Sequence, residues 1–139
     1  MKKFLSVLAA LLFLLPAGLS AQTAGDGNDL FKPIARYLGN GDTANLSAWM
    51  APYVDISVVS SLNITSRAHA VRILDDFFAS HKPGGLQITH TASQPNLKYA
   101  VGTLSAGGEK FSVTLFAAYT EKDGFKIQQI KIDRSTGIF

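Results

Sequence analysis

From about Leu86 onward, the spacing of apolar residues changes from a helical period to strict alternation, and this change limits the possible folds more than any other feature of the chain. Three alternating sets follow one another: Leu86, Ile88 and His90; then Leu97, Tyr99, Val101 and Thr103; then Phe111, Val113, Leu115, Ala117 and Tyr119. Turn signals lie between neighbouring sets at residues 106–108 and 122–124. The pattern predicts an antiparallel meander of four strands without another helix.

The last of these strands contains a change of phase. Phe125 and Ile127 are in phase with each other, whereas Ile130 and Ile132 follow the opposite register. One extra residue near Gln128 would bring both pairs onto the same face, as a β-bulge does. We therefore expect the strand to bend at Gln128 and Gln129.

Two helices are expected before the first strand. Leu30, Ile34, Tyr37 and Leu38 recur at helical spacing, and the glycine-rich residues 39–42 end that helix. A second, short helix begins at a cap formed by Asp42 or Thr43. It is expected to run through Leu46, Trp49 and Met50 and to end at Pro52.

A strand and a long helix complete the first half. Residues 54–58 alternate between apolar and polar side chains, which places Asp55 on the polar side of a strand. Thr65 or Ser66 then caps a helix from Arg67 to about Ser80. The apolar face of this helix consists of Ala70, Val71, Ile73, Leu74, Phe77 and Phe78.

This order of elements predicts the α+β class, with helices packed on a curved, mainly antiparallel sheet. At this point the chain resembles the nuclear-transport-factor-2-like superfamily, the cone-shaped fold shared with ketosteroid isomerase and the polyketide cyclases. More narrowly, residues 76–78, 88–90, 99–104 and 127–132 look like the bacterial domain-of-unknown-function family 4783. The resemblance implies an exported protein with the same cone and no assigned activity.

The N-terminus has the order of a secretory signal peptide. Lys2 and Lys3 precede the apolar run from Phe4 to Leu15, and small residues end the segment at Ala21. We therefore expect residues 1–21 to be a signal peptide, 22–28 a flexible leader and 29–139 a single domain, exported to the periplasm or secreted. The apolar run is shorter than the roughly 20 residues that span a bilayer, so no stable membrane anchor is expected after cleavage.

Composition argues against several classes of site. Without Lys2 and Lys3 the basic residues fall from 13 to 11 against 10 acids, so the net charge falls from +3 to +1, and no basic stripe for nucleic acid is expected. The chain has no cysteine, and its three histidines lack the spacing of a metal site. No glycine-rich phosphate loop follows a strand, so no cofactor is expected.

Candidate ligand-binding residues come from the strand faces. His90 shares the expected phase of Leu86 and Ile88, which would bring it to the rim of the cone. Tyr99, Tyr119 and Thr103 would place hydroxyl groups in the same cavity, and Trp49 either seals the short helix onto the sheet or forms an aromatic lid. No catalytic residue is assigned, because Asp55, His69 and His81 fall on polar faces or at a helix end.

Three functions remain open. The leading hypothesis is an exported, non-enzymatic domain that binds a small apolar ligand or a protein partner. The first alternative is an isomerase, cyclase or dehydratase in which His90 is the base and Tyr99 a hydrogen-bond donor. The second is a homodimeric interaction module that uses the sheet face carrying Lys98, Ala100, Ser112 and Thr114.

Overall fold

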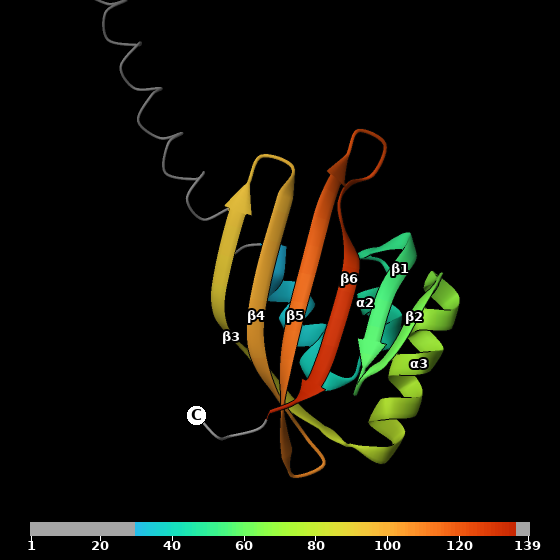
Figure 1. The fold of residues 1–139 in the computed structure, drawn as a ribbon, viewed down its shortest axis with the longest axis vertical. Helices are drawn as coiled ribbons and strands as arrows, with labels where there is room; N and C mark the ends of the chain where they lie inside the picture. The colour runs from blue at the N-terminus through green and yellow to red at the C-terminus, as the bar shows by residue number, and fades with distance from the viewer. Residues whose placement is uncertain (1–29, 136–139) are drawn as a thin grey trace, which may run out of the picture.

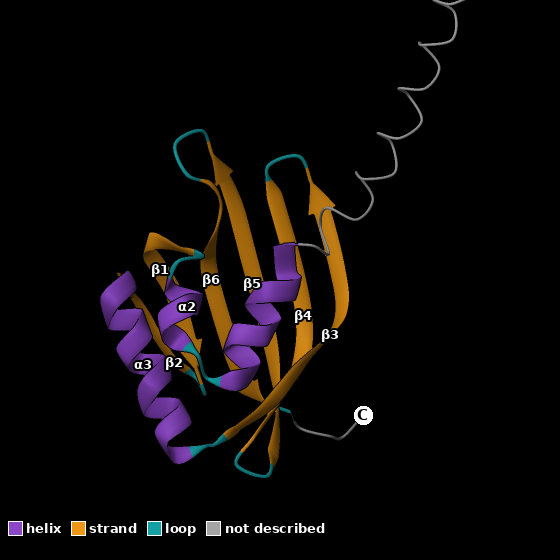
Figure 2. Cartoon of the chain, turned by 180° about the vertical axis from the view of Figure 1, so that it is seen from behind, coloured by secondary structure: helices purple, strands orange, loops and turns teal. Residues whose placement is uncertain are grey.

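Three helices lie on one face of a six-stranded sheet in residues 30–135, the part of the chain that the computed structural model describes (Figures 1 and 2). The predicted signal peptide, residues 1–21, and the predicted leader, residues 22–28, lie outside the described residues. Within residues 30–135, no helix combines the length and the apolar character needed to cross a membrane.

The helices begin and end largely where the sequence predicts. The first helix spans residues 30–40, α2 spans Thr43–Ser47 and α3 spans Arg67–Ser80. Asp42 caps α2 by accepting a hydrogen bond from the Asn45 amide, and Ser66 caps α3 by accepting one from the His69 amide. Each cap is one of the two residues that the sequence proposes.

The short helix is shorter than predicted, because the strand β1 (Met50–Val58) begins before Pro52. Met50 pairs with Ile127 and buries its side chain fully. Pro52 lies between the two stretches of β1 that pair with β6, and the pairing of β1 with β2 starts only at Tyr53. Its missing amide proton therefore removes no sheet hydrogen bond, which is why a proline is tolerated there.

The sheet is mixed and mainly antiparallel, which confirms the α+β class. The remaining strands are β2 (Ser61–Ser66), β3 (Pro83–Gln94), β4 (Leu97–Ala106), β5 (Glu109–Thr120) and β6 (Gly124–Arg134). Their order is β2-β1-β6-β5-β4-β3, and β1 pairs with β6 in parallel while the other neighbours are antiparallel. The hairpin partner β2 was not predicted from the sequence.

The predicted bulge in β6 is confirmed. Phe116 of β5 pairs with Gln129 and Ala117 pairs with Ile127, so Gln128 has no partner on β5. As a result Ile127 and Ile130 both face the helices and are fully buried. The extra residue thus gives the two halves of β6 the same buried face.

A second bulge, in β3, was not predicted. Ile88 pairs with Gly102 and His90 pairs with Val101, so Thr89 is the extra residue. Leu86 and Ile88 pack against the core, whereas the bulge turns His90 onto the opposite face of the sheet. The expectation that these three residues share one face was therefore wrong.

The core lies between the helices and the sheet face they cover. It contains Phe31, Ile34 and Leu38 from the first helix, Leu46 from α2, Leu74 and Phe77 from α3, and Leu104, Phe111, Val113, Leu115, Ile127, Ile130 and Ile132 from the sheet. On β4 the buried positions are Lys98, Ala100, Gly102, Leu104 and Ala106. The alternate set that begins at Leu97 faces away from the helices, so this face of the sheet, toward the viewer in Figure 1, is left open.

Candidate functional site

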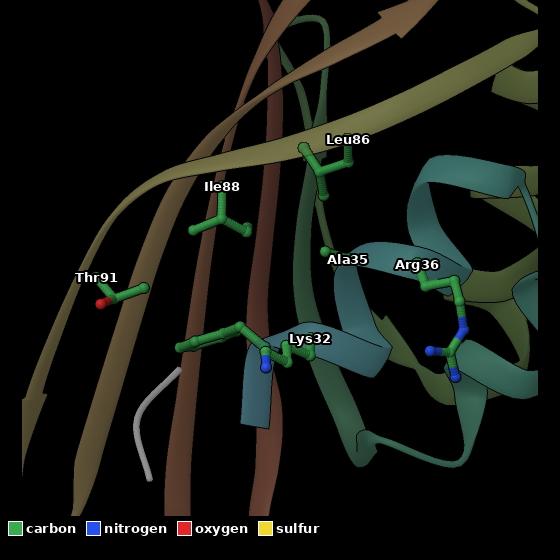
Figure 3. A pocket seen from close by; sticks show the side chains of 7 residues that line it. Lys32, Ala35, Arg36, Leu86, Ile88 and Thr91 are labelled. Carbon is green, nitrogen blue, oxygen red and sulfur yellow. The ribbon is translucent and has the colours of Figure 1, made fainter. Parts of the chain in front are cut away.

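A groove of about 530 Å³ runs between the first helix and β3 (Figure 3). Its lining consists of Phe31, Lys32, Ala35 and Arg36 from the helix and of Leu86, Ile88 and Thr91 from β3. In Figure 3 the side chains of Leu86 and Ile88 point from β3 toward the helix, and Ala35 faces them. The groove therefore has apolar walls on both sides.

Helical spacing and one glycine give the groove its shape. Ala35 follows Phe31 by four residues, so both lie on one side of the helix, and the short side chain of Ala35 leaves space beside β3. At the other end of the helix, a Cβ on Gly39 would lie 2.5 Å from the Leu86 nitrogen. The helix can thus approach β3 closely at residue 39, while the groove lies alongside the part of the helix from Phe31 to Arg36.

Two cationic residues lie beside the apolar walls. Lys32 and Arg36 are exposed and one turn apart on the first helix. Neither forms an ion pair with a carboxylate among residues 30–135, although the Arg36 guanidinium lies 5.1 Å from the centre of the Tyr37 ring. Among residues 30–135, no histidine or carboxylate lines this groove. The residues present suit binding of an apolar molecule, with positive charge along one rim.

Beyond the groove, a buried lysine lies on the same face of the sheet. Lys98 of β4 is 9% exposed, and its ammonium donates a hydrogen bond of 2.9 Å to the Ser93 hydroxyl of β3. The ammonium also lies 4.8 Å from the centre of the Phe125 ring, and that ring packs edge-on against Tyr119. The cluster combines one desolvated cation, one hydroxyl and two aromatic rings.

The five residues proposed from the sequence do not meet in one place. His90, Tyr99 and Thr103 lie on the open face, where the ring centres of His90 and Tyr99 are 6.5 Å apart. Tyr119 lies on the opposite face beside Phe125 and is 46% exposed. Trp49 packs against the core between α2 and β1, and its carbonyl accepts a hydrogen bond from the Ile127 amide.

The four residues proposed for a homodimer surface lie on two different faces of the sheet. Lys98 and Ala100 lie on the face that the helices cover, and both are buried. Ser112 and Thr114 lie on the open face, because they pair with Thr103 and Val101 of β4. A single surface that contains all four residues was therefore a wrong expectation.

Sequence reasoning missed Lys98 for a physical reason that concerns β4. Where helices approach a sheet closely, its covered face carries small side chains, and on β4 these are Ala100, Gly102 and Ala106. The larger alternate residues, among them Tyr99, were taken for the buried set. Leu104 was the one available signal, since it is large, apolar and in phase with Lys98.

No group of three or more histidine, cysteine or acidic side chains in residues 30–135 is arranged to hold a metal ion. On the covered face, the Lys98 ammonium and the Ser93 hydroxyl are two polar groups joined by a hydrogen bond.

The arrangement of helices and curved sheet defines the class as nuclear-transport-factor-2-like. A putative dehydratase from this class in Streptomyces avermitilis superposes with a TM-score of 0.58 over 84% of this chain and 97% of its own, at 16% identity. At that identity the likeness shows the fold alone.

The particular family follows from the sequence. The model of the domain of unknown function DUF4783 matches residues 31–133, and the chain belongs to this family. DUF4783 proteins from Bacteroides uniformis and Bacteroides fragilis superpose with TM-scores of 0.69 and 0.68, at 20% and 22% identity. Each alignment covers 73% of this chain, and 94% and 95% of the respective relative. No curated protein matches the chain.

Proposed function

We propose that this chain is an exported, non-enzymatic binding domain and that the groove between the first helix and β3 holds a small apolar ligand. The observation that carries the proposal is the groove itself, about 530 Å³ with Phe31, Ala35, Leu86 and Ile88 as apolar walls. A volume of this size falls within the range of small-molecule sites, which are concave and mostly apolar.

The character of the lining supports binding rather than catalysis. General acid–base catalysis requires a titratable group within hydrogen-bond reach of the reacting atom. Within the described part of the chain, the groove lining includes two exposed cations, Lys32 and Arg36, and neither a histidine nor a carboxylate. The enzyme alternative would use His90 as the base, but His90 faces the open side of the sheet rather than the inside of the cone.

Export is supported by the sequence of the first 21 residues. A basic pair, an apolar run and small residues follow one another in the order that signal peptidase requires. The measurement is the intact mass of the protein recovered outside the cytoplasm, which should correspond to loss of residues 1–21.

The groove is tested with decan-1-ol as the apolar probe. Binding to the folded state alone raises the unfolding midpoint, by an amount that grows with ligand concentration. We expect decanol to raise the midpoint of the wild-type protein and to have no effect on Ala35→Trp, whose indole fills the groove. Ala79→Trp, an exposed alanine on α3, is the matched control and should respond as the wild type does.

An equal response from Ala35→Trp would mean that decanol binds elsewhere, and no response from the wild type would reject the groove as a binding site. Probe recovered from the protein should be chemically unchanged by mass spectrometry. Recovery of a transformed product would contradict the proposal and show that the protein is an enzyme.

A second candidate function rests on the open face of the sheet. Tyr53, Leu62 and Ile64 are 71%, 63% and 76% exposed on β1 and β2. Beside them, Asp55 has a buried carboxylate oxygen without a hydrogen-bond partner among residues 30–135, and on the same face the Lys131 ammonium of β6 lies 3.7 Å from the Asp133 carboxylate. A face with both a carboxylate and an ammonium is complementary to itself, so we propose a second copy of this chain as its partner.

The solution mass of the protein tests this second candidate. Sedimentation equilibrium should give a dimer for the wild type and a monomer for Ile64→Lys, which places a charge in the apolar patch. Tyr119→Lys, on the other face, should remain dimeric. A monomeric wild type at all concentrations, or a dimer that survives Ile64→Lys, contradicts the interface.

A further inference from the structure

We propose that Lys98 binds the acidic head of the ligand, so that the groove takes an amphipathic carboxylic acid rather than a wholly apolar molecule. The proposal rests on the proposed function, since it assigns the apolar part of that ligand to the groove. It adds a site, formed by Lys98 and Ser93, and a ligand class.

The burial of Lys98 is the first reason. An ammonium has three hydrogen-bond donors and is strongly stabilised by water, so a buried lysine is normally paired with a carboxylate. Lys98 is 9% exposed, donates one hydrogen bond, to Ser93, and forms no ion pair with any carboxylate in the described part of the chain. The Phe125 ring stabilises part of the positive charge of Lys98, but it does not neutralise that charge as an anion would.

The surroundings of Lys98 strengthen this reason. On the side away from Ser93, Lys98 pairs with Ala117 of β5, and Ala117 pairs with Ile127 of β6. Both Ala117 and Ile127 are fully buried. Electrostatic attraction to an anion is stronger among apolar neighbours than in water. A carboxylate that reached Lys98 would therefore gain more than one bound at an exposed lysine.

The position of Lys98 relative to the groove is the second reason. Leu86 and Ile88 line the groove from β3, and Ser93 lies farther along the same strand on the same face. The strand therefore leads from the apolar walls to the Ser93 hydroxyl. Figure 2 shows that the first helix begins at the same end of the sheet as the β3–β4 turn, so Phe31 rather than Gly39 lies toward this end.

The exposed cations are weaker candidates for the head. Lys32 and Arg36 are solvated, so an anion that binds them displaces water and gains little. Lys98 has already lost most of its water on folding, and an arriving carboxylate would replace it. Lys98 thus differs from the two cations at the groove rim in how little water it retains.

The experiment compares decanoate with decan-1-ol at pH 7 on the folded wild-type protein. Because a hydrogen bond to a charged group is worth more than one between neutral groups, we expect decanoate to bind at least about tenfold more tightly than decanol. Lys98→Met should remove this preference and leave the affinity for decanol within about twofold, while Lys98→Arg keeps a preference. The matched control is Lys110→Met, because Lys110 also donates to a serine five residues away, Ser105, but is exposed.

An NMR measurement on the wild-type protein tests the proposal even if a Lys98 variant fails to fold. The side-chain ammonium resonance of Lys98 should shift with decanoate and stay unchanged with decanol. Loss of the preference in Lys32→Met or Arg36→Met, or its survival in Lys98→Met, overturns the proposal.

The two proposals fail differently. Binding of decanol that Ala35→Trp abolishes, without any preference for decanoate, keeps the groove and rejects Lys98 as the anchor. A preference for decanoate that depends on Lys98 but survives Ala35→Trp keeps Lys98 as the anchor and rejects the groove as the site of the apolar chain.

Discussion

The turn between β1 and β2 places two ordinary residues in left-handed backbone conformations. Val59 has φ 49° and Ser60 has φ 72°, in the two-residue turn that joins the paired residues Val58 and Ser61. Such turns favour Asn-Gly because a side chain at positive φ costs about 1–2 kcal/mol. Neither residue here is of that kind, so the turn carries strain.

Replacement of Ser60 by glycine should relieve part of this strain. We expect Ser60→Gly to raise the free energy of unfolding by about 0.5–1 kcal/mol, since the gain in the folded state exceeds the added freedom of the unfolded chain. Ser61→Gly, one residue later in extended backbone, should lower it by about as much. Urea denaturation measures both, and a loss of stability in Ser60→Gly would show that the turn is not strained.

At single residues, the two bulges show why one was predictable and the other was not. Gln128 lies between two apolar pairs of opposite phase, so the sequence itself records the extra residue. Beyond Thr89, the residues of β3 on the covered face are Thr91 and Ser93, whose polar side chains give no phase. The placement of His90 could not be predicted because the signal that would have corrected it is absent.

Between elements, the approach of the first helix to β3 depends on Gly39. A Cβ there would lie 2.5 Å from the Leu86 backbone nitrogen, and backbone atoms cannot move aside cheaply. We expect Gly39→Ala to lower the free energy of unfolding by about 1–3 kcal/mol and to weaken decanol binding, because the helix must shift. At Gly84 the nearest atom to an added Cβ is 3.5 Å away, so Gly84→Ala is the control with little effect.

The long helix offers a second test at this scale. Phe77 of α3 is 7% exposed and its ring packs edge-on against Phe111 and stacks on His81, while Phe78 is half-buried. Phe77→Ala should cost about 3–5 kcal/mol. Phe78→Ala should cost less, about 1–2 kcal/mol, because it buries less surface. Equal denaturant midpoints for the two variants would contradict the burial seen here.

Helices were predictable because period and caps are local signals. The stretch from Arg67 to Ser80 has both, and its bounds agree with the structure. The groove depends instead on where residues 30–40 lie against β3, some fifty residues later in the chain. The separation in space between the helix and β3 depends on Gly39 and on the small residues of β4. No pattern within the helix or within β3 predicts this separation.

For the molecule as a whole, the sheet has one covered and one open face, and alternation alone does not say which is which. The meander of β3 to β6 follows from the alternating pattern, and the fold class follows from the order of elements. On β4 both faces carry partly apolar sets, so the assignment of Tyr99 and Lys98 required the helices to be in place. Exposure of Tyr53 and Ile64 on the open face could not be inferred before β2 was known to be a strand.

The bulge at Gln128 determines whether the whole sheet can bury one face. Ile127 on one side of it and Ile130 and Ile132 on the other are fully buried under the helices. Deletion of Gln128 leaves β6 with a regular ladder, which turns one of these two groups onto the open face. Each buried isoleucine moved to solvent costs about 1.5–3 kcal/mol before any cavity is counted, and domains are stable by only about 5–15 kcal/mol.

We therefore expect the variant lacking Gln128 to lose cooperative unfolding, as measured by circular dichroism in urea. The matched control removes Lys122, which is exposed in the turn between β5 and β6, and a shortened surface turn should cost little because it moves no buried side chain. Wild-type amide hydrogen bonding measured by NMR should place Gln129 opposite Phe116 and Ile127 opposite Ala117. A variant without Gln128 that unfolds within about 1 kcal/mol of the wild type would mean that β6 buries only one of its two apolar groups, since no regular strand can turn both toward the helices.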